Sequence, residues 1–217
     1  MLPAADHDSR AVGAADEDSR VIICLGTRLP VAVRCRRLRG TADAGTPRKG
    51  THVPTDRQST DLEAYSARAR SGPCFVCAFL AGHPDYRHET VFEDQHHVAF
   101  LDKWPTVPGK VLVAPEAHIE HVVRDLDEAA YLRLMQVVRE VALAVESVCG
   151  SERTYLYSLG SQQGNAHLHW HVAALPAGVP YEQQQFHALM TENGTLPYTD
   201  AEAAALGERL RAALAEE

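Results

Sequence analysis

Three histidines alternate with apolar residues: His167, His169 and His171 are separated by Leu168 and Trp170. In an extended strand alternate side chains point to the same side, so the three imidazoles would share one face while Leu168 and Trp170 point into the core. A helix would scatter the same rings over its surface. The pattern therefore predicts a strand with one packed face and one face built for chemistry.

A row of imidazoles suits the transfer of phosphoryl or nucleotidyl groups. Histidine has an ordinary pKa of about 6.5, so its neutral form can attack phosphorus at physiological pH, and a protonated neighbour can neutralise the developing charge. A histidine-rich metal-binding tract and chance alternation are the alternatives, since the chain has 12 histidines. Strict alternation with apolar partners favours the catalytic interpretation.

A second group with chemical potential is the pair Cys74 and Cys77, which has the C-x-x-C spacing of a zinc knuckle. A redox pair and two simply buried thiols are the alternatives. The chain has five cysteines at irregular spacing, which does not predict a disulfide framework. A closed zinc site would need two further ligands from elsewhere in the chain.

The elements that would position these residues begin near residue 59. Runs of β-branched and apolar residues predict strands at 90–93, 97–101, 110–114, 154–158 and 167–174. Helical periodicity predicts helices at 61–70, directly after Pro115, and at 125–148, 181–192 and 199–215. The longest helix has an apolar stripe made of Leu132, Met135, Val138, Val141, Leu143 and Val145. Adjacent strands joined by short turns predict an α+β fold, with a long helix packed on an antiparallel sheet.

Residues 1–58 have a different character, with a repeated Ala-Ala-Asp-x-Asp-Ser-Arg at 4–10 and 14–20 and no sustained periodicity. Such a composition cannot bury enough apolar surface to offset chain entropy, so we expect a disordered N-terminal extension. A second hypothesis is that translation begins near Val53. The chain thus divides into an extension at 1–58, one α+β domain at 59–180 and C-terminal helices at 181–217.

The formal net charge of −8 argues against binding to nucleic acid polymers, which would require a basic face. A small nucleotide needs only a local cluster of donors. No apolar run reaches the length of a membrane span, and the best candidate, Val21 to Val33, is interrupted by Gly26 and Pro30. We expect no membrane partner and a cytoplasmic location.

The triad and its surroundings resemble the histidine triad (HIT) family, whose signature alternates three histidines with apolar residues. Here the signature reads His167-Leu-His-Trp-His-Val-Ala, and upstream the segments 93–102 and 108–118 follow the family's central run. The resemblance covers residues 72–176 and is closest to zinc-containing bacterial members described as diadenosine tetraphosphate hydrolases. It implies a HIT-like antiparallel sheet, a nucleotide substrate and a homodimer.

The resemblance also implies roles for individual residues. His169 would be the nucleophile that carries a covalent nucleotidyl group, and His171 would orient the phosphate and assist the leaving group. Asp102 would contact the ribose hydroxyls, with a loop-capping role as the alternative, and Gln163 would contact the phosphate. Ser158 would be a further substrate contact, because Ser158-Leu-Gly stands where the family has Asn-x-Gly.

Two other positions depart from the family's pattern. Gly164 stands where the family has Ser or Thr, and Lys110 stands where it has His. These departures affect the phosphate contacts and the choice of substrate, and they leave the nucleophile unchanged.

In zinc-containing members the metal ligands include the histidine after the central strand and the first triad histidine. The implied ligand set is therefore Cys74, Cys77, His118 and His167, around a structural zinc ion. Such an ion would tie the knuckle to the triad segment and fix His169 two residues further on.

The expected function is hydrolysis of a dinucleoside polyphosphate or another nucleoside phosphoanhydride. A nucleotidyltransferase or phosphorylase of the same superfamily is the nearest alternative. A non-catalytic, zinc-stabilised nucleotide-binding protein is the alternative from another functional class.

Overall fold

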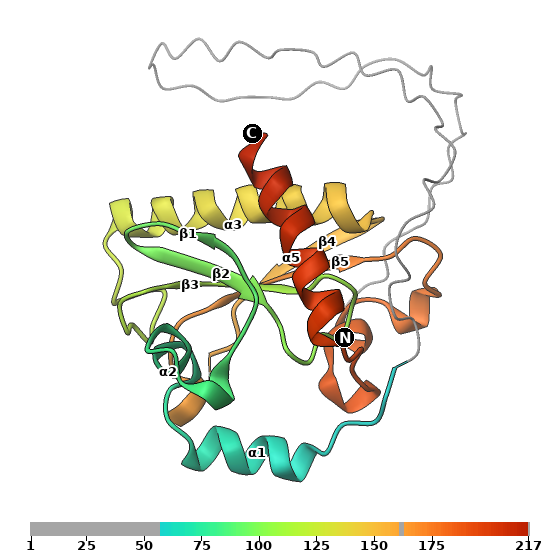
Figure 1. Cartoon of the computed structure of the whole chain (residues 1–217), viewed down its shortest axis with the longest axis horizontal. Coiled ribbons are helices and arrows are strands. Elements are labelled where there is room, and N and C mark those ends of the chain that lie inside the picture. The colour runs from blue at the N-terminus through green and yellow to red at the C-terminus, as the bar shows by residue number, and fades with distance from the viewer. Residues whose placement is uncertain (1–56, 161–162, 217) are drawn as a thin grey trace, which may run out of the picture. The chain divides into compact units, whose positions relative to one another are not determined.

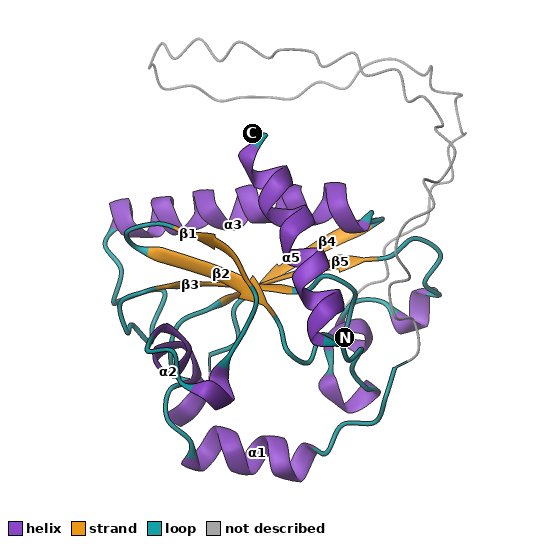
Figure 2. Ribbon diagram, viewed as in Figure 1, coloured by secondary structure: helices purple, strands orange, loops and turns teal. Residues whose placement is uncertain are grey.

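A five-stranded antiparallel sheet is the centre of the computed structural model, which describes residues 57–160 and 163–216 (Figures 1 and 2). Its strands are β1 Thr90–Glu93, β2 His97–Leu101, β3 Val111–Pro115, β4 Arg153–Tyr157 and β5 Trp170–Leu175. The order across the sheet is β1-β2-β3-β5-β4. Strand β5 thus has hydrogen-bonded neighbours on both sides, which fixes the end of the triad segment firmly in the sheet.

Two long helices cover one face of this sheet: α3, Glu128–Cys149, and α5, Asp200–Ala215 (Figure 1). Helix α3 begins where the side chain of Asp127 accepts the N–H of Ala130, and it ends at Gly150, whose φ of 68° suits glycine. Its buried side chains are Leu134, Val137, Val138, Val141, Ala142, Ala144 and Val145. They pack on inward-facing strand residues and form the main core. The predicted α+β class and the long packed helix are confirmed.

The opposite face of the sheet carries a smaller apolar cluster. Val76 of α2, Phe75–Leu80, packs there with Phe100 and Leu112. Helix α1, Leu62–Ser71, lies next to α2 on this side in Figure 1 and has no buried residue. Helix α1 packs against η2, the 3-10 helix Gln163–Asn165 that precedes the triad.

The segment after β5 does not form the single helix predicted at 181–192. It contains the short elements η3 Tyr181–Gln183, α4 Phe186–Leu189 and η4 Thr191–Asn193. Gln185 has a φ of 53°, a left-handed conformation that interrupts a helix. The helix predicted at 199–215 is confirmed as α5, which a capping box of Thr199 and Glu202 begins.

Two further predictions about elements were wrong in detail. The segment after Pro115 forms turns instead of a helix, because the Asp125 carboxylate accepts the N–H of His121 and closes a turn there. Leu132 was placed on the buried stripe of α3 but is 58% exposed.

Strand β5 begins at Trp170, three residues later than the predicted start at His167. The reason is that the N–H of Leu168 donates to the carbonyl of Ile119, in the loop after β3, and takes no part in the sheet's ladder.

The predicted disordered extension at 1–58 lies outside the described residues, except for its last two positions. Gln58 forms an isolated bridge with Thr195. The domain boundaries therefore remain predictions. Among the described helices, none combines the length and the apolar composition that crossing a bilayer requires.

Candidate active site and metal-binding cluster

His169 lies just before β5, and a hydrogen bond fixes the tautomer of its neutral ring. Its Nδ1 is 2.7 Å from the carbonyl oxygen of His167. Because a carbonyl oxygen only accepts, Nδ1 carries the proton and Nε2 keeps its lone pair. Of the two intervening residues, Leu168 is buried in the main core and Trp170 packs against it partly buried, on the side that the alternation predicted. The segment thus offers a nucleophilic nitrogen on the face away from α3.

His171 is the triad residue that belongs to β5 itself. Its cross-strand partners are Leu112 on β3 and Tyr157 on β4. The imidazole stacks on the Tyr157 ring with centroids 4.5 Å apart and planes at 4°, and it meets the His169 ring edge-on at 4.9 Å. Its Nδ1 is buried and has no hydrogen-bond partner in the described part of the chain. A bound ligand can supply that partner.

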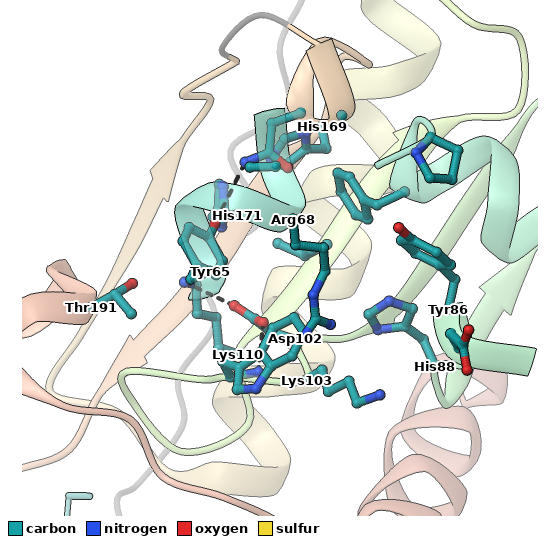
Figure 3. Close-up of a pocket in the computed structure, with 18 residues that line it drawn as sticks. Tyr65, Arg68, Tyr86, His88, Asp102, Lys103, Lys110, His169, His171 and Thr191 are labelled. Carbon is teal, nitrogen blue, oxygen red and sulfur yellow. Dashed lines mark hydrogen bonds and ion pairs between the residues drawn. The ribbon is translucent and has the colours of Figure 1, made fainter. Parts of the chain in front are cut away.

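Both of these histidines line a cavity between the sheet and α1 (Figure 3). Tyr86 and His88 line the same cavity on the side away from His169 and His171. The Phe75 ring connects the two regions, with its centroid 5.1 Å from that of His169 and 6.4 Å from that of His88. The cavity therefore combines an aromatic surface that suits a base with imidazoles that suit a phosphate.

Asp102, the expected ribose contact, lines this cavity as half of an ion pair with Lys110. The Lys110 Nζ is 2.9 Å from Oδ2 of Asp102, and the two side chains are 6% and 13% exposed. The other carboxylate oxygen accepts the N–H of Trp104 at 2.9 Å. The backbone N–H of Asp102 also donates to the Lys110 carbonyl, so the pair closes the loop between β2 and β3.

The electrostatics of this pair favour both charged forms. Burial by itself would raise the pKa of Asp102, but the Lys110 cation and the Trp104 N–H lower it overall. Burial opposes the charge on Lys110, yet the Asp102 carboxylate raises the pKa of the ammonium. Asp102 is thus held ionised and fixed in orientation.

The two cavity histidines are held neutral. Burial lowers the pKa of His169, although the hydrogen bond to His167 opposes this effect. Burial and the Lys110 cation together lower the pKa of His171 to about 2. In the ligand-free site His171 is therefore neutral, with one N–H and one lone pair.

The remaining expected substrate contacts lie differently. The Ser158 hydroxyl donates to the carbonyl oxygen of His169 at 2.8 Å, and the residue does not line the cavity. Ser158 therefore supports the backbone of the triad. The side chain of Gln163 lies outside the described part of the structure, and its backbone begins η2.

Gly164 packs directly against the end of α1. A Cβ at this position would lie 2.8 Å from the carbonyl oxygen of Ala69 and 3.2 Å from that of Pro73. Both atoms belong to the backbone, so a side chain would force the backbone to move. This contact gives a physical reason for glycine where the family has Ser or Thr.

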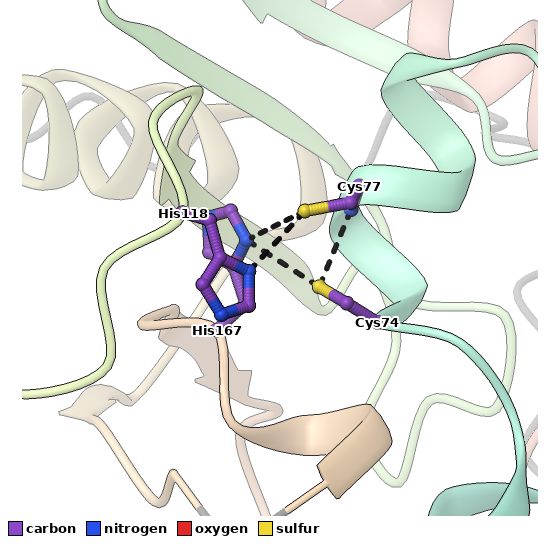
Figure 4. A group of neighbouring side chains, drawn as sticks. All are labelled: Cys74, Cys77, His118 and His167. Atoms are coloured by element: carbon purple, nitrogen blue, oxygen red, sulfur yellow. Dashed lines mark hydrogen bonds between the residues drawn. The ribbon is translucent and has the colours of Figure 1, made fainter.

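The four expected zinc ligands come together in a cluster between α2, the loop after β3 and the triad segment (Figure 4). Their ligand atoms all lie within 4.8 Å of one another. The Nδ1 atom of His167 is 3.5 Å from Sγ of Cys74 and 3.6 Å from Sγ of Cys77, and the Nδ1 atom of His118 is 3.2 Å from Sγ of Cys77. Zinc bonds of about 2.3 Å to sulfur and 2.0 Å to nitrogen at tetrahedral angles separate such atoms by roughly 3.5 Å. The donor set and its spacing therefore fit a tetrahedral metal ion.

Hydrogen bonds outside the cluster orient its two imidazoles. Nε2 of His167 lies 2.8 Å from the carbonyl oxygen of Pro115, so it carries the proton and leaves Nδ1 deprotonated toward the sulfurs. Nε2 of His118 lies 3.4 Å from the Glu120 carboxylate. Carbonyl and carboxylate partners of this kind orient metal-binding histidines in proteins.

Several cavity residues had no signal in the sequence. Tyr65 and Arg68 lie on a helix whose pattern shows nothing of its approach to the triad, and His88 lies in a loop. Lys110 stood out only because it departs from the family's pattern. Its pairing with Asp102 depends on the closing of the β2–β3 loop, which local sequence does not reveal.

Comparison with known proteins agrees with this geometry. The model of the HIT domain family matches residues 84–176. The protein hit of Bacillus subtilis is 33% identical over 106 residues, which are 48% of this chain and 70% of the relative. An uncharacterized HIT-like protein of Saccharolobus solfataricus is 30% identical over 104 residues, which are 48% of this chain and 73% of the relative.

Solved structures share the fold. A hypothetical histidine triad nucleotide-binding protein from Sulfolobus tokodaii has a TM-score of 0.53 and 24% identity, with 66% of this chain and 93% of that one covered. A zinc-bound histidine triad family protein from Mycobacterium smegmatis has a TM-score of 0.52 and 23% identity, with coverage of 66% and 94%. The family match, the relatives of at least 30% identity and the paired triad histidines in one cavity show that this chain belongs to the HIT domain family.

Proposed function

We propose that the protein hydrolyses a nucleoside phosphoanhydride through a covalent nucleotidyl group on His169. The observation that carries this proposal is the 2.7 Å hydrogen bond from Nδ1 of His169 to the His167 carbonyl, which leaves Nε2 as the reactive nitrogen. A protein of the same fold, from Sulfolobus tokodaii, is described as nucleotide-binding, which supports a nucleotide as the ligand.

In the first step the lone pair on Nε2 attacks the phosphorus next to the nucleoside. A P–N bond forms, and the bond from phosphorus to the bridging oxygen breaks with its electron pair on that oxygen. The positive charge that develops on the His169 ring is stabilised by the carbonyl that accepts its Nδ1–H. The leaving group departs as a phosphate or nucleotide anion.

In the second step water attacks the same phosphorus. The P–N bond breaks, its electron pair returns to Nε2, and the proton of water passes to solvent or to a product oxygen. If inorganic phosphate or a sugar phosphate took the place of water, the protein would be a phosphorylase or a nucleotidyltransferase. Among the described residues that line the cavity, none distinguishes water from these acceptors, so the substrate panel below identifies the acceptor.

The state of His171 favours an anhydride over an ester. In the ligand-free site burial and Lys110 favour the neutral form of this ring, and a neutral imidazole is a poorer proton donor to an alkoxide than an imidazolium. A phosphate leaving group needs no such proton. Within the anhydrides, we expect diadenosine tetraphosphate as a substrate.

Binding of the nucleoside follows from the same cavity. The ionised Asp102 can accept hydrogen bonds from ribose hydroxyls, since each of its oxygens has a second lone pair. The Phe75 ring, 5.1 Å from His169, provides a surface for the base next to the reacting atoms.

We also propose that the cluster of Cys74, Cys77, His118 and His167 holds a structural zinc ion. A zinc-bound protein of this fold, from Mycobacterium smegmatis, supports that choice of metal. The ion would supply a fixed anchor for the triad segment, and all four ligand positions would be taken by the protein. A homodimer is the assembly that we expect, and sedimentation of the purified protein tests it.

A substrate panel combined with rapid acid quenching tests the proposed reaction. During turnover of a dinucleoside polyphosphate, intact mass should reveal a chain heavier by one nucleotidyl group. His169→Ala should lose this adduct and at least about a thousandfold of the turnover, while binding persists. His187→Ala, an exposed histidine outside the cavity, is the matched control and should retain both.

If wild-type protein binds nucleotides but neither turns them over nor forms an adduct, the non-catalytic alternative is correct. If acceptor transfer exceeds hydrolysis, the protein is a transferase. If His169→Ala retains full turnover, the covalent mechanism is wrong.

A further inference from the structure

Helix α1 forms one wall of the cavity although it lies outside the residues that the family model matches. The match begins at residue 84, whereas α1 spans Leu62–Ser71. Two of its side chains, Tyr65 and Arg68, line the cavity together with the triad histidines (Figure 3). This wall is therefore a feature of this chain that family membership does not explain.

Two cations meet on the aromatic ring of Trp104 at this wall. The guanidinium carbon of Arg68 lies 4.7 Å from the ring centroid, and the Lys103 Nζ lies 5.6 Å from it. The Tyr65 ring contacts the same indole edge-on at 6.2 Å. In Figure 3 the Arg68 side chain runs from α1 toward Lys103. An exposed helix and the β2–β3 loop thus bring their positive charges to one place.

Neither cation is neutralised by a carboxylate in the described part of the chain. The ion pairs found there leave out both Arg68 and Lys103. The third cation of the cavity, Lys110, is paired with Asp102 at 2.9 Å. The remaining acidic residue of the lining is Asp85. The wall therefore carries a positive charge, in a chain whose formal net charge is −8.

We propose that Arg68 and Lys103 form a cationic clamp for the phosphate chain of the substrate. This inference rests on the proposed function and narrows its substrate class to nucleotides with a long phosphate chain. A guanidinium that lies over an indole can still direct its N–H groups at anionic oxygens. Local positive charge is also what a polyanion requires to approach an acidic protein.

A purely structural role for Arg68 is the competing interpretation. Helix α1 has no buried residue, so the contact with Trp104 could serve only to hold the helix in place. The two roles differ in what they predict. A structural contact affects every ligand of the cavity equally, whereas a clamp discriminates between ligands by the number of their phosphates.

Equilibrium binding of ATP and AMP to the full chain separates these interpretations, since the two ligands share one nucleoside. Every chain in this experiment carries His169→Ala, because the proposed hydrolase would otherwise consume ATP, and the chain with no further change is the wild-type reference. This reference should bind ATP more tightly than AMP, with an affinity ratio that falls as salt concentration rises. Arg68→Gln should weaken ATP binding by roughly tenfold and AMP binding by less than about twofold. Arg70→Gln, which removes an exposed arginine of the same helix outside the cavity, is the matched control and should change neither value.

Lys103→Gln is a second variant, and it leaves the Arg68 contact with Trp104 intact. It should also lower the ratio of ATP affinity to AMP affinity. Equal losses for both ligands, or an unchanged ratio in both variants, would overturn the clamp. A ratio near one in the wild type would overturn it as well. These measurements need no turnover. If ATP binding is lost selectively while the substrate panel shows no hydrolysis, the proposed hydrolase is rejected and the clamp is kept. If the protein binds neither nucleotide, both proposals are rejected.

Discussion

The carbonyl oxygen of His167 accepts the Nδ1–H of His169 at 2.7 Å, so a single residue joins the Cys/His cluster, our proposed zinc site, to the cavity. The imidazole of His167 faces the two cysteines, and its backbone orients the proposed nucleophile. An ion in the cluster would therefore fix the position of His169 without any contact with the substrate.

Removal of the metal should lower stability and activity together. Metal binding to a cluster that exists only in the folded chain contributes directly to folding free energy. By elemental analysis we expect about one zinc ion per chain in the wild type and much less than half a zinc ion per chain in Cys77→Ser. The variant should also unfold at a lower temperature and lose at least about tenfold in turnover, because the support of His169 is loosened.

His169→Ala is the informative counterpart to this variant. It removes the reactive ring and leaves all four cluster ligands, so it should keep its zinc while losing turnover. Its unfolding temperature should fall by a few degrees, because a buried ring and its hydrogen bond are lost, but the fall should be smaller than in the zinc-free variant. If His169→Ala lost the metal, or if Cys77→Ser kept full activity, the separation between an anchoring cluster and a reacting histidine would be wrong.

Ser158→Ala should weaken the second support of the nucleophile. The lost hydrogen bond to the His169 carbonyl, 2.8 Å long, leaves that acceptor partly buried and unpaired. Such a loss costs about 1 kcal/mol, which lowers the unfolding temperature of a domain of this size by roughly 2–4 °C. We expect kcat to fall several-fold with KM nearly unchanged, because the serine does not line the cavity. Substrate binding is best compared between His169→Ala and the double variant that also carries Ser158→Ala, since neither turns over the substrate. Equal affinity in the two chains would confirm that Ser158 acts on the triad and not on the ligand.

The buried pair of Asp102 and Lys110 should stabilise the fold over a wide pH range. The folded-state pKa of Asp102 is lowered, so its contribution is present above roughly pH 4 and is lost as pH falls further. The pKa of Lys110 is raised, so its contribution is present below roughly pH 10 and is lost as pH rises further. Between these limits the stabilisation should not depend on pH.

Asp102→Asn tests this pair, because it leaves the Lys110 ammonium buried without its counter-ion. Such a break costs about 3–5 kcal/mol near pH 5 in urea unfolding of the zinc-loaded protein. The cost should shrink as pH rises toward about 10, because burial without the counter-ion lowers the pKa of Lys110 and lets it lose its proton in the folded chain. Adding Lys110→Met should recover part of the loss, since no unpaired charge then remains buried. A loss that stays the same at every pH, or that Lys110→Met does not relieve near pH 5, would contradict an ion pair with both partners charged.

Local sequence was sufficient to predict the elements in which apolar side chains recur at a regular period. The alternation around His167, His169 and His171 predicted that Leu168 and Trp170 enter the core. Leu168 is buried there, and Trp170 packs against it partly buried. The ligand set with Cys74 came from the resemblance, and the fold brings it together.

The parts that sequence could not show depend on contacts between distant segments. Arg68 reaches the cavity because α1 packs on η2, almost a hundred residues later in the chain. The delayed start of β5 arises because Leu168 bonds to Ile119 and leaves the ladder. Neither relationship leaves a periodic pattern in the sequence, so each requires the folded structure.

Gly164→Ala tests the contact that ties α1 to the triad segment. The added Cβ would lie 2.8 Å from the carbonyl oxygen of Ala69, a distance that a backbone atom can relieve only if α1 or η2 moves. We expect a loss of about 1–3 kcal/mol in unfolding free energy and a fall in the ATP to AMP binding ratio, because Arg68 moves with the helix. Gly160→Ala is the matched control in the same loop, since its Cβ would find its nearest neighbour at 3.9 Å. If both variants behaved like the wild type, α1 would not be held against η2 by this contact, and the position of Arg68 would need another explanation.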